Sequence, residues 1–320
     1  VTLYGFHITF SAFYILIDKI IETQTPTVVG LDPKLDYIPE YIKEKCIAKH
    51  GEGFKAAAAA LYKFNKGIID AVCDVVPAVK PQAAYYEMYG YYGVKALYKT
   101  IRYAQSKGMY VILDGKRNDI GATMEAYSAA YLGTTDVFGK NEQPFGADSL
   151  TVNGYLGTDG IAPALKTGGS IFVLVKTSNK SSGELQDRRL CDGKTIYETM
   201  GDMCEKWGAD SIGKYGYSAV GAVVGATYPA MLTEMREKLP HTFFLVPGYG
   251  AQGGGAEGVA GGFDKNGLGA IVNSSRAVMC AYKKEGCDEH DYAAAARREV
   301  LRMKEDITSH IPQIKAPENN

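Results

Sequence analysis

Short apolar runs alternate about eight times with longer amphipathic segments along this 320-residue chain, and this alternation restricts its fold more than any other feature. Most runs are solid with Val, Ile, Leu and Ala instead of alternating with polar residues, which is typical of parallel strands covered by helices on both faces. We predict strands at residues 27–31, 75–80, 110–114, 149–153, 171–176, 219–225, 243–247 and 269–273.

The amphipathic segments between these runs predict helices. The first contains five consecutive alanines, which are strong helix formers, and several others are followed by a glycine of the kind that ends helices. The predicted helices are residues 54–73, 92–106, 124–132, 195–207 and 290–310. Eight strand–helix alternations favour a single α/β domain, a closed (β/α)₈ TIM barrel, over an open doubly wound sheet.

The barrel domain is expected to occupy residues 15–312, since about 250 residues form such a barrel and insertions are common. Residues 1–14 differ in character from the rest and are expected to be an N-terminal extension or a remnant of expression. Residues 313–320 are expected to form a C-terminal tail. The apolar stretch at residues 8–17 is too short to span a bilayer, and it lacks the basic start and the cleavage pattern of a signal peptide.

The overall charge does not direct the chain to a polyanion. The 35 basic and 36 acidic residues give a net charge of −1, so we expect no nucleic acid or membrane partner, and an anionic ligand must be held by a local site. The six cysteines include no C-x-x-C pair, and none lies beside a histidine at zinc-ligand spacing. We therefore expect no metal site, reduced cysteines and a cytoplasmic location.

Polar or charged side chains gather where the predicted strands end. They are Asp32, Lys80, Asp114, Asn153 and Lys176. The carboxyl ends of barrel strands meet on one face, where the active sites of barrel enzymes are built. Any one of these residues could be a solvated loop residue, but five on one rim favour a shared site.

The densest group of charges follows the third predicted strand and consists of Asp114, Lys116 and Asp119. If the strand continues through Lys116, its side chain shares a face with that of Asp114. With Lys80 pointing into the same space, positive and negative groups would alternate, which is the arrangement that makes buried charge tolerable. A purely structural ion-pair network is the alternative reading of this pattern.

In these residues the chain resembles the orotidine 5′-monophosphate decarboxylase family. The family motif D-x-K-x-x-D-I-x-x-T is matched by Asp114, Lys116, Asp119, Ile120 and Thr123. Further family positions resemble Asp32 and Lys80 on the first two strands, residues 247–253 after the seventh strand, and Arg276 after the eighth. The motifs occur in the family's order between Thr27 and Arg276, so the resemblance is specific.

The resemblance implies decarboxylation of orotidine 5′-monophosphate to uridine 5′-monophosphate and CO₂, the last step of de novo pyrimidine nucleotide synthesis, with no metal or organic cofactor. It implies that Lys116 stabilises the carbanion that forms at C6 and then protonates it. Asp114 is expected to lie near the departing carboxylate, and Lys80 and Asp119 are expected to complete an alternating array of charges.

The resemblance also implies a homodimer with two shared active sites. In the family, the residues at the positions of Asp119, Ile120 and Thr123 reach the site of the other subunit. Asp114 and Lys116 are thus expected to serve their own subunit's site, and Asp119 that of its neighbour.

The nucleotide phosphate is expected to bind between the seventh and eighth strands. Residues 248–253 satisfy G-x-G-x-x-G, but a dinucleotide-binding turn would open an early strand–turn–helix unit, whereas this segment follows the seventh strand. Pro247, Gln252, Ser275 and Arg276 are the expected contacts, with the arginine supplying a planar fork of donors. A flexible loop is the alternative reading of the glycine-rich segment.

The same resemblance assigns the rest of the ligand. Asp32 is expected to hold the ribose hydroxyls with help from Gln82, and Ser178 is expected to read the polar edge of the pyrimidine. The long polar loop at residues 178–190 is expected to close as a lid, and a mobile surface loop is the alternative.

Two other functions remain open at this point. The first is a magnesium-dependent sugar-phosphate decarboxylase or aldolase of the same barrel superfamily, although those relatives carry an acidic metal ligand where this chain has Lys80. The second is a catalytically silent nucleotide-binding barrel, which would need a broken set of charged residues. A Ser-His-Asp arrangement has no basis in the sequence, because no histidine lies at a predicted strand end with a partner.

Overall fold

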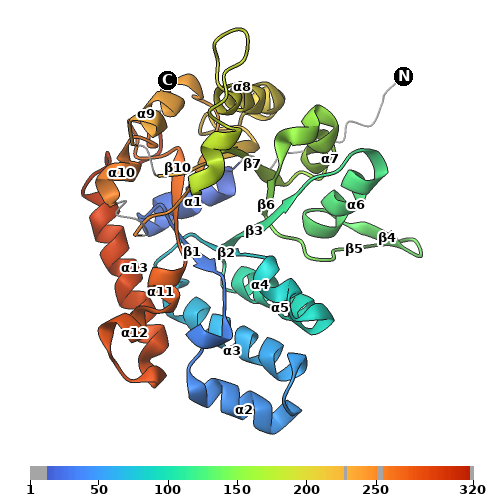
Figure 1. Ribbon diagram of the computed structural model, residues 1–320, viewed down its shortest axis with the longest axis vertical. Helices are drawn as coiled ribbons and strands as arrows, with labels where there is room; N and C mark the ends of the chain where they lie inside the picture. Colours follow the sequence, from blue (N-terminus) through green and yellow to red (C-terminus); the bar gives the residue numbers. More distant parts are fainter. Residues whose placement is uncertain (1–12, 227–228, 251–254, 318–320) are drawn as a thin grey trace.

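The computed structural model describes residues 13–226, 229–250 and 255–317. Within these residues eight parallel strands close into a barrel in the order β1-β10-β9-β8-β7-β6-β3-β2 (Figure 1). The strands are β1 (Thr27–Leu31), β2 (Ala78–Pro81), β3 (Tyr110–Arg117), β6 (Ser149–Val152), β7 (Ser170–Lys176), β8 (Val220–Val224), β9 (Phe244–Pro247) and β10 (Ala270–Ser274). The predicted (β/α)₈ barrel is confirmed, and each of the eight predicted strands is present within a few residues of its expected ends.

The strands are buried because helices cover the outside of the barrel and side chains fill its interior. Every residue of β1, β2, β6, β8 and β10 is buried. This explains why the strands appear in the sequence as continuous apolar runs and not as alternating patterns.

Longer helices form the outer layer (Figure 1). They are α2 (Glu40–His50), α3 (Phe54–Val72), α5 (Gly90–Ser106), α6 (Gly121–Tyr131), α8 (Ile196–Gly208), α9 (Pro229–Lys238) and α13 (Tyr292–Thr308). The alanine-rich α3 packs against α2, α5 and α13, and its buried residues recur at the three- and four-residue spacing of one helix face, as in Leu61, Phe64 and Ile68. The five predicted helices are present, whereas α2 and α9 were not predicted.

Shorter elements connect these layers. Single-turn or two-turn helices follow several strands, namely α4 (Ala84–Glu87), α7 (Ala162–Leu165), α10 (Ala256–Ala260), α11 (Arg276–Met279) and α12 (Ala281–Glu285). A small antiparallel hairpin, β4 (Thr135–Val137) and β5 (Lys140–Glu142), projects beside α6, with Phe138 fully exposed at its tip (Figure 1).

Helix α1 (Tyr14–Thr23) covers the end of the barrel at which the strands begin. Its residues Lys19 and Thr23 line a surface cavity together with Pro77 and Lys107, which precede β2 and β3. This helix was not predicted, although its buried residues Leu16, Ile17 and Ile20 have the three- and four-residue spacing of one helix face.

Phe13, directly before α1, is fully buried. Its ring centre lies 4.7 Å from that of Phe172 on β7 and 5.3 Å from that of Phe243, which precedes β9. Near the other terminus, Ile314 is also buried, and its backbone carbonyl accepts a hydrogen bond from Gln24. The proposed divisions at residues 14/15 and 312/313 stay predictions, but the described residues on both sides of them pack into one core.

Among the described residues, no helix is long and apolar enough to cross a membrane.

Phe13 is expected to be a major source of stability at this end of the barrel. Phe13→Ala removes a fully buried ring that touches two others, so the free energy of unfolding should fall by about 3–5 kcal/mol, as measured by urea denaturation. Phe138→Ala is the matched control, since the same substitution at a fully exposed site should change stability by less than about 0.5 kcal/mol. Equal effects at both sites would show that Phe13 does not pack as described.

Candidate active site

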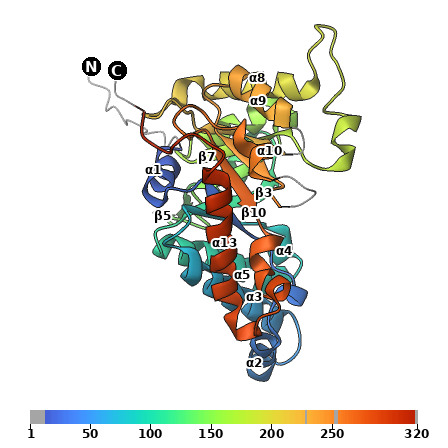
Figure 2. The same cartoon turned by 90° about the vertical axis from the view of Figure 1, so that its left-hand side faces the viewer.

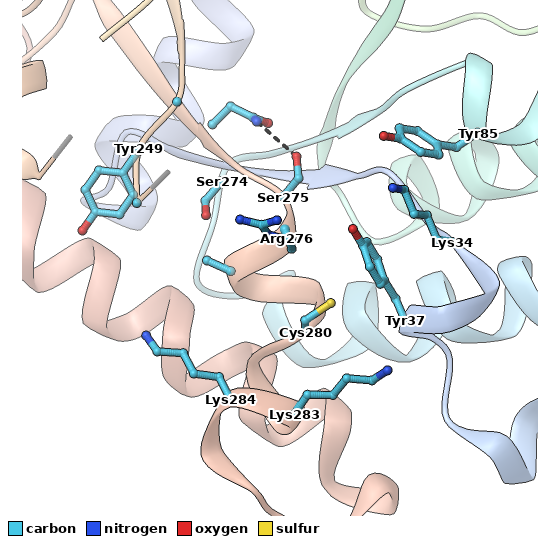
Figure 3. A pocket seen from close by; sticks show the side chains of 14 residues that line it. Lys34, Tyr37, Tyr85, Tyr249, Ser274, Ser275, Arg276, Cys280, Lys283 and Lys284 are labelled. Carbon is cyan, nitrogen blue, oxygen red and sulfur yellow. Dashed lines mark hydrogen bonds between the residues drawn. The ribbon is translucent and has the colours of Figure 1, made fainter. Parts of the chain in front are cut away.

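Two neighbouring cavities open at the carboxyl ends of the strands. The inner cavity, about 440 Å³, is lined by Lys80, Asp114, Lys116, Thr151, Ser178 and Pro247, among others. The outer cavity, about 760 Å³, is lined by Lys34, Gly248, Ser275, Arg276, Lys283 and Lys284, among others (Figure 3). They meet where Pro247 at the end of β9 lines the first and Gly248 lines the second, so an elongated ligand can occupy both.

The Asp114 carboxylate is the centre of the inner cavity, because each of its oxygens is bonded to a lysine. Oδ2 accepts a hydrogen bond from Lys80 Nζ at 2.7 Å, and Oδ1 accepts one from Lys116 Nζ at 2.6 Å. Oδ1 also accepts a hydrogen bond from Thr151 Oγ1 at 2.8 Å. Three charged groups from β2 and β3 therefore alternate in sign, as predicted.

This alternation favours the charged forms of Asp114 and Lys80. Burial tends to raise the pKa of Asp114, but the ammonium groups of Lys80 and Lys116 outweigh it and hold that pKa well below its usual range. Burial likewise tends to lower the pKa of Lys80, but the carboxylates of Asp114 and Asp32 raise it above its ordinary value. The Asp114 carboxylate thus lies between the side-chain nitrogens of two lysines.

The backbone at Lys116 is left-handed, with φ at 47°, which is uncommon for a residue other than glycine. Strand β3 does continue through Lys116, but its pairing with β6 is irregular between Leu113 and Arg117. The Lys116 N–H donates to Thr151 Oγ1 at 3.0 Å and its ammonium to Asp114, so two hydrogen bonds hold a conformation that costs about 1–2 kcal/mol. The regular alternation assumed from the sequence was therefore wrong in detail, although the two side chains do meet.

Thr151 was missed in the sequence analysis. Its hydroxyl accepts from the backbone of Lys116 and donates to Asp114, so it joins β6 to both charged residues of β3. The available signal was a hydroxyl residue between Leu150 and Val152 in a buried strand. Such a residue needs hydrogen-bond partners, but only Asn153, at the end of this strand, was predicted to belong to the site.

Two of the polar residues at the strand ends serve the scaffold. Asn153 Oδ1 accepts a hydrogen bond from the backbone of Tyr155 and caps the 3₁₀ helix η2 (Gly154–Gly160). The ammonium of Lys176 lies 2.5 Å from Asp187 Oδ1 and 3.4 Å from Ser182 Oγ. Both residues lie at the rim, as predicted, but they fix loops and do not line the inner cavity.

Asp32 lies just past the end of β1, next to the charged group. Its negative charge acts on Lys80, and its buried Oδ1 accepts no hydrogen bond from any described residue. An unsatisfied buried carboxylate oxygen is costly, and a hydroxyl group of a ligand would satisfy it. Asp32 does not line either cavity, so its contact with a sugar hydroxyl stays a prediction.

Ser178 lines the inner cavity at the turn after β7. The preceding residue, Thr177, is held by Gln186, whose Oε1 accepts from the Thr177 N–H at 2.9 Å and whose Nε2 donates to Thr177 Oγ1 at 2.8 Å. Gly225 lets this turn approach β8, because a Cβ atom there would lie only 2.9 Å from Ser178 Cβ. The loop at residues 178–190, predicted as a lid, contains the 3₁₀ helix η3 (Lys180–Glu184), and the adjoining chain protrudes from the barrel (Figure 2).

Ser275 and Arg276 lie on the outer cavity directly after β10 (Figure 3). Arg276 is exposed, and its guanidinium forms no hydrogen bond or ion pair with another described residue, so it is available to a ligand. Gly30 on β1 allows Ser275 to sit here, since a Cβ atom at Gly30 would lie 1.9 Å from Ser275 Oγ. Gln252, the other predicted phosphate contact, lies outside the described residues.

Like Asp32, four other predicted site residues do not line either cavity as the single chain forms it. Asp119 Oδ1 accepts a hydrogen bond from the backbone of Ile120, and within the described residues it forms no ion pair with either lysine. Ile120 and Thr123 are exposed on the outside of the barrel. The amide oxygen of Gln82 accepts a hydrogen bond from the N–H of Ala84, the first residue of α4. Their roles toward a ligand stay predictions.

Across the described part of the chain, no group of three or more His, Cys, Asp and Glu side chains is placed to hold a metal ion.

Comparison with known proteins shows to which family a chain with this site belongs. Residues 54–286 match the model of the "Orotidine 5'-phosphate decarboxylase / HUMPS family". The chain belongs to this family. Orotidine 5′-phosphate decarboxylase of Rhodopirellula baltica is 44% identical over 296 residues, which cover 90% of this chain and 96% of that protein. The enzyme of the same name from Caldicellulosiruptor bescii is 44% identical over 302 residues, covering 92% and 97%.

Solved structures agree with this assignment. The Leishmania donovani OMP decarboxylase superposes with a TM-score of 0.69 at 29% sequence identity, covering 92% of this chain and 99% of that one. The similarity therefore extends over the whole barrel and is not confined to the motif around Asp114.

The position of Asp114 between two cations predicts a specific effect on stability. Asp114→Asn leaves two ammonium groups with no anion between them. We expect the free energy of unfolding at pH 7 to fall by about 3 kcal/mol, the lower end for breaking a buried ion pair, because the Lys116 side chain is 45% exposed. Urea denaturation measures the change, and Asp159→Asn, at an exposed position, is the matched control.

The pH dependence of this effect has a defined sign. Since folding lowers the pKa of Asp114, its stabilising contribution is complete above the unfolded-state pKa of about 3.9 and is lost as the pH falls toward the folded-state value. The difference in the free energy of unfolding between the wild type and Asp114→Asn should thus become smaller by about 1.4 kcal/mol per pH unit below about pH 4. A difference that stays constant down to pH 3 would contradict the ion-pair geometry.

Proposed function

We propose that this chain decarboxylates orotidine 5′-monophosphate to uridine 5′-monophosphate and CO₂. The observation that carries the proposal is the Lys80–Asp114–Lys116 array, which lies in a cavity of the right size for a pyrimidine and is continuous with an arginine-bearing cavity. Relatives at 44% identity carry the name of this enzyme.

The chemical step requires a cation at the atom where charge develops. When the bond between C6 and the carboxylate breaks, its electron pair stays on C6 and neutral CO₂ leaves. The Lys116 ammonium stabilises that electron pair and then transfers a proton to C6, after which the neutral amine regains a proton from water. A fixed cation in a site shielded from water lowers the barrier far more than the same cation in solution.

Asp114 and Lys80 prepare this step. Asp114 fixes the Lys116 ammonium through a 2.6 Å hydrogen bond, and its own negative charge lies beside the expected position of the substrate carboxylate. That proximity of two anions is relieved when CO₂ leaves. Lys80, bonded to the other oxygen of Asp114, keeps the carboxylate ionised and in place.

The substrate then extends from the inner to the outer cavity. We place the pyrimidine against Ser178, the ribose hydroxyls at the free Oδ1 of Asp32, and the phosphate at Arg276 and Ser275 beside the backbone of Gly248. Glycine lets backbone N–H groups approach a phosphate closely, and arginine offers paired donors.

A magnesium-dependent sugar-phosphate enzyme is the less favoured alternative. Such an enzyme would need an acidic metal ligand at the position of Lys80, whose ammonium is buried and bonded to Asp114. A cation at this point repels Mg²⁺, which prefers oxygen ligands.

A spectrophotometric assay of orotidine monophosphate in excess chelator tests the activity. We expect full activity with chelator, and a loss of at least about 1,000-fold for Lys116→Ala, since one residue supplies both the charge and the proton. Lys166→Ala, at an exposed position away from the cavities, is the matched control and should retain activity. Loss of turnover in chelator would favour the magnesium-dependent alternative, and binding of uridine monophosphate without turnover would favour a silent binding barrel.

We further propose a homodimer in which Asp119 serves the neighbouring subunit's site. In the single chain Asp119 does not join the lysines, although it follows them closely in the sequence. Large apolar side chains are exposed beside it, with Ile120 at 53%, Tyr155 at 77% and Leu156 at 44%. Ile120 directly precedes α6, and Tyr155 and Leu156 lie on η2, which contacts α6. A Cβ atom at Gly160 would lie 3.1 Å from Asp119 O and 3.5 Å from Leu156 Cβ, so this apolar surface adjoins Asp119, and we propose that a second copy of the chain covers it.

Mixing two inactive variants tests the shared sites. In a heterodimer of Lys116→Ala and Asp119→Ala subunits, one site carries both substitutions and the other carries neither. Equal mixing with full subunit exchange should therefore restore about a quarter of wild-type activity. If Asp119 served its own subunit, each site would carry one substitution and activity would not return.

A cytoplasmic location completes the proposal. The six cysteines are all unpaired with one another, which suits a reducing compartment.

A further inference from the structure

The outer cavity carries more positive charge than a nucleoside monophosphate uses. Three lysines line it together with Arg276 and are here called the outer lysines: Lys34, which follows β1, and Lys283 and Lys284 on α12. Figure 3 shows Arg276 near the middle of the cavity, with Lys34 and Tyr37 to one side and Lys283 and Lys284 below it.

These cations are not neutralised by the protein. Among the described residues, no aspartate or glutamate lines the outer cavity, and none of its four cations forms an ion pair. Lys283 donates a hydrogen bond to the backbone carbonyl of Asp36, and the Lys34 ammonium lies 5.7 and 5.9 Å from the ring centres of Tyr37 and Tyr85. Neither contact supplies a negative charge. The concentration of charge is local, because the whole chain has a net charge of −1.

The cavity also has more space than one phosphate group fills. At about 760 Å³ it is larger than the 440 Å³ inner cavity that holds the reactive lysines. A phosphate group displaces only a few water volumes of about 30 Å³ each. A monophosphate at Arg276 thus leaves both volume and the outer lysines unused.

We propose that the outer lysines bind the outer phosphates of nucleoside 5′-di- and triphosphates, so that uridine nucleotides with longer phosphate chains occupy the active site and compete with the substrate. The inference rests on the proposed function in one respect, the placement of the 5′-phosphate at Arg276. A phosphate monoester carries a charge of about −2 at neutral pH. In the di- and triphosphates, each further phosphoryl group adds negative charge beyond the 5′-phosphate, where the outer lysines lie.

Because the outer lysines are exposed, each contact with phosphate is weak and depends on the salt concentration. All three are exposed, so their attraction for phosphate is screened by salt. Affinity for the longer nucleotides should therefore depend on ionic strength more steeply than affinity for the monophosphate.

Inhibition of decarboxylation by uridine mono-, di- and triphosphate tests the proposal. The assay contains chelator, so that no divalent cation masks the phosphates, and is run at about 0.01 M and about 1 M salt, where charges act over about 30 Å and 3 Å respectively. At low salt we expect the triphosphate to inhibit about tenfold more tightly than the monophosphate, with the diphosphate between them. At high salt the three should become similar.

The combined variant Lys34→Ala/Lys283→Ala/Lys284→Ala should lose this preference while keeping its inhibition by uridine monophosphate within about twofold, as expected for exposed ion pairs. Lys284→Ala alone, which leaves the contact of Lys283 with Asp36 intact, should weaken only the triphosphate, by about two- to fivefold. The combined variant Lys49→Ala/Lys55→Ala/Lys166→Ala removes the same charge at exposed sites elsewhere and should behave as wild type.

Three results would overturn the proposal. Equal inhibition of the wild type by the three nucleotides at low salt would show that the outer lysines do not bind the outer phosphates. A preference that survives in the outer-lysine variant would assign it to other residues. If uridine monophosphate did not compete with the substrate at all, the placement of the 5′-phosphate at Arg276 would be wrong, and the proposed function with it. The first two results would leave the proposed function intact.

Discussion

The carboxylate of Asp114 organises the whole inner cavity, because one buried anion binds two lysines and a threonine from three different strands. Lys80, Lys116 and Thr151 lie on β2, β3 and β6, which are neighbours in the barrel but are separated by helices in the chain. Each cation offsets part of the free-energy cost of burying the anion, and the anion in turn raises the pKa of Lys80. Removing any one charge would leave the others without compensation, so the group is a unit and not a sum of pairs.

The barrel makes this unit possible by bringing strand ends together, and it extends the site in one direction only. Pro247 and Gly248 lead from the inner cavity to the outer one, so the reactive lysines and Arg276 occupy opposite ends of one elongated site. Contacts far from the reacting carbon can then supply binding energy for orientation and for bringing like charges close together. A substrate that lacked its phosphate would fill the inner cavity and yet lose that contribution.

Much of this architecture could be predicted from the sequence because its signals are local. Buried parallel strands appear as solid apolar runs, and the spacing of Asp114 and Lys116 places both on one strand. The contribution of Thr151 could not be predicted with the same ease, since it depends on register between β3 and β6. The packing of Phe13, directly before α1, could not be predicted because it depends on rings on β7 and before β9, more than 150 residues away. Lys176 and Asn153 were correctly placed at the rim, but only the three-dimensional contacts reveal that they hold loops.

The left-handed backbone at Lys116 sets activity and stability in opposition. Glycine adopts this conformation freely, so Lys116→Gly would relieve about 1–2 kcal/mol of strain while removing the proposed proton donor. The strain relieved would partly offset the loss of the ion pair with Asp114, whereas nothing would offset the loss of the proton donor. During drift after a gene duplication, a copy released from its reaction would be expected to change here early. The residue at this position would then report, in any descendant sequence, whether the barrel is still an enzyme.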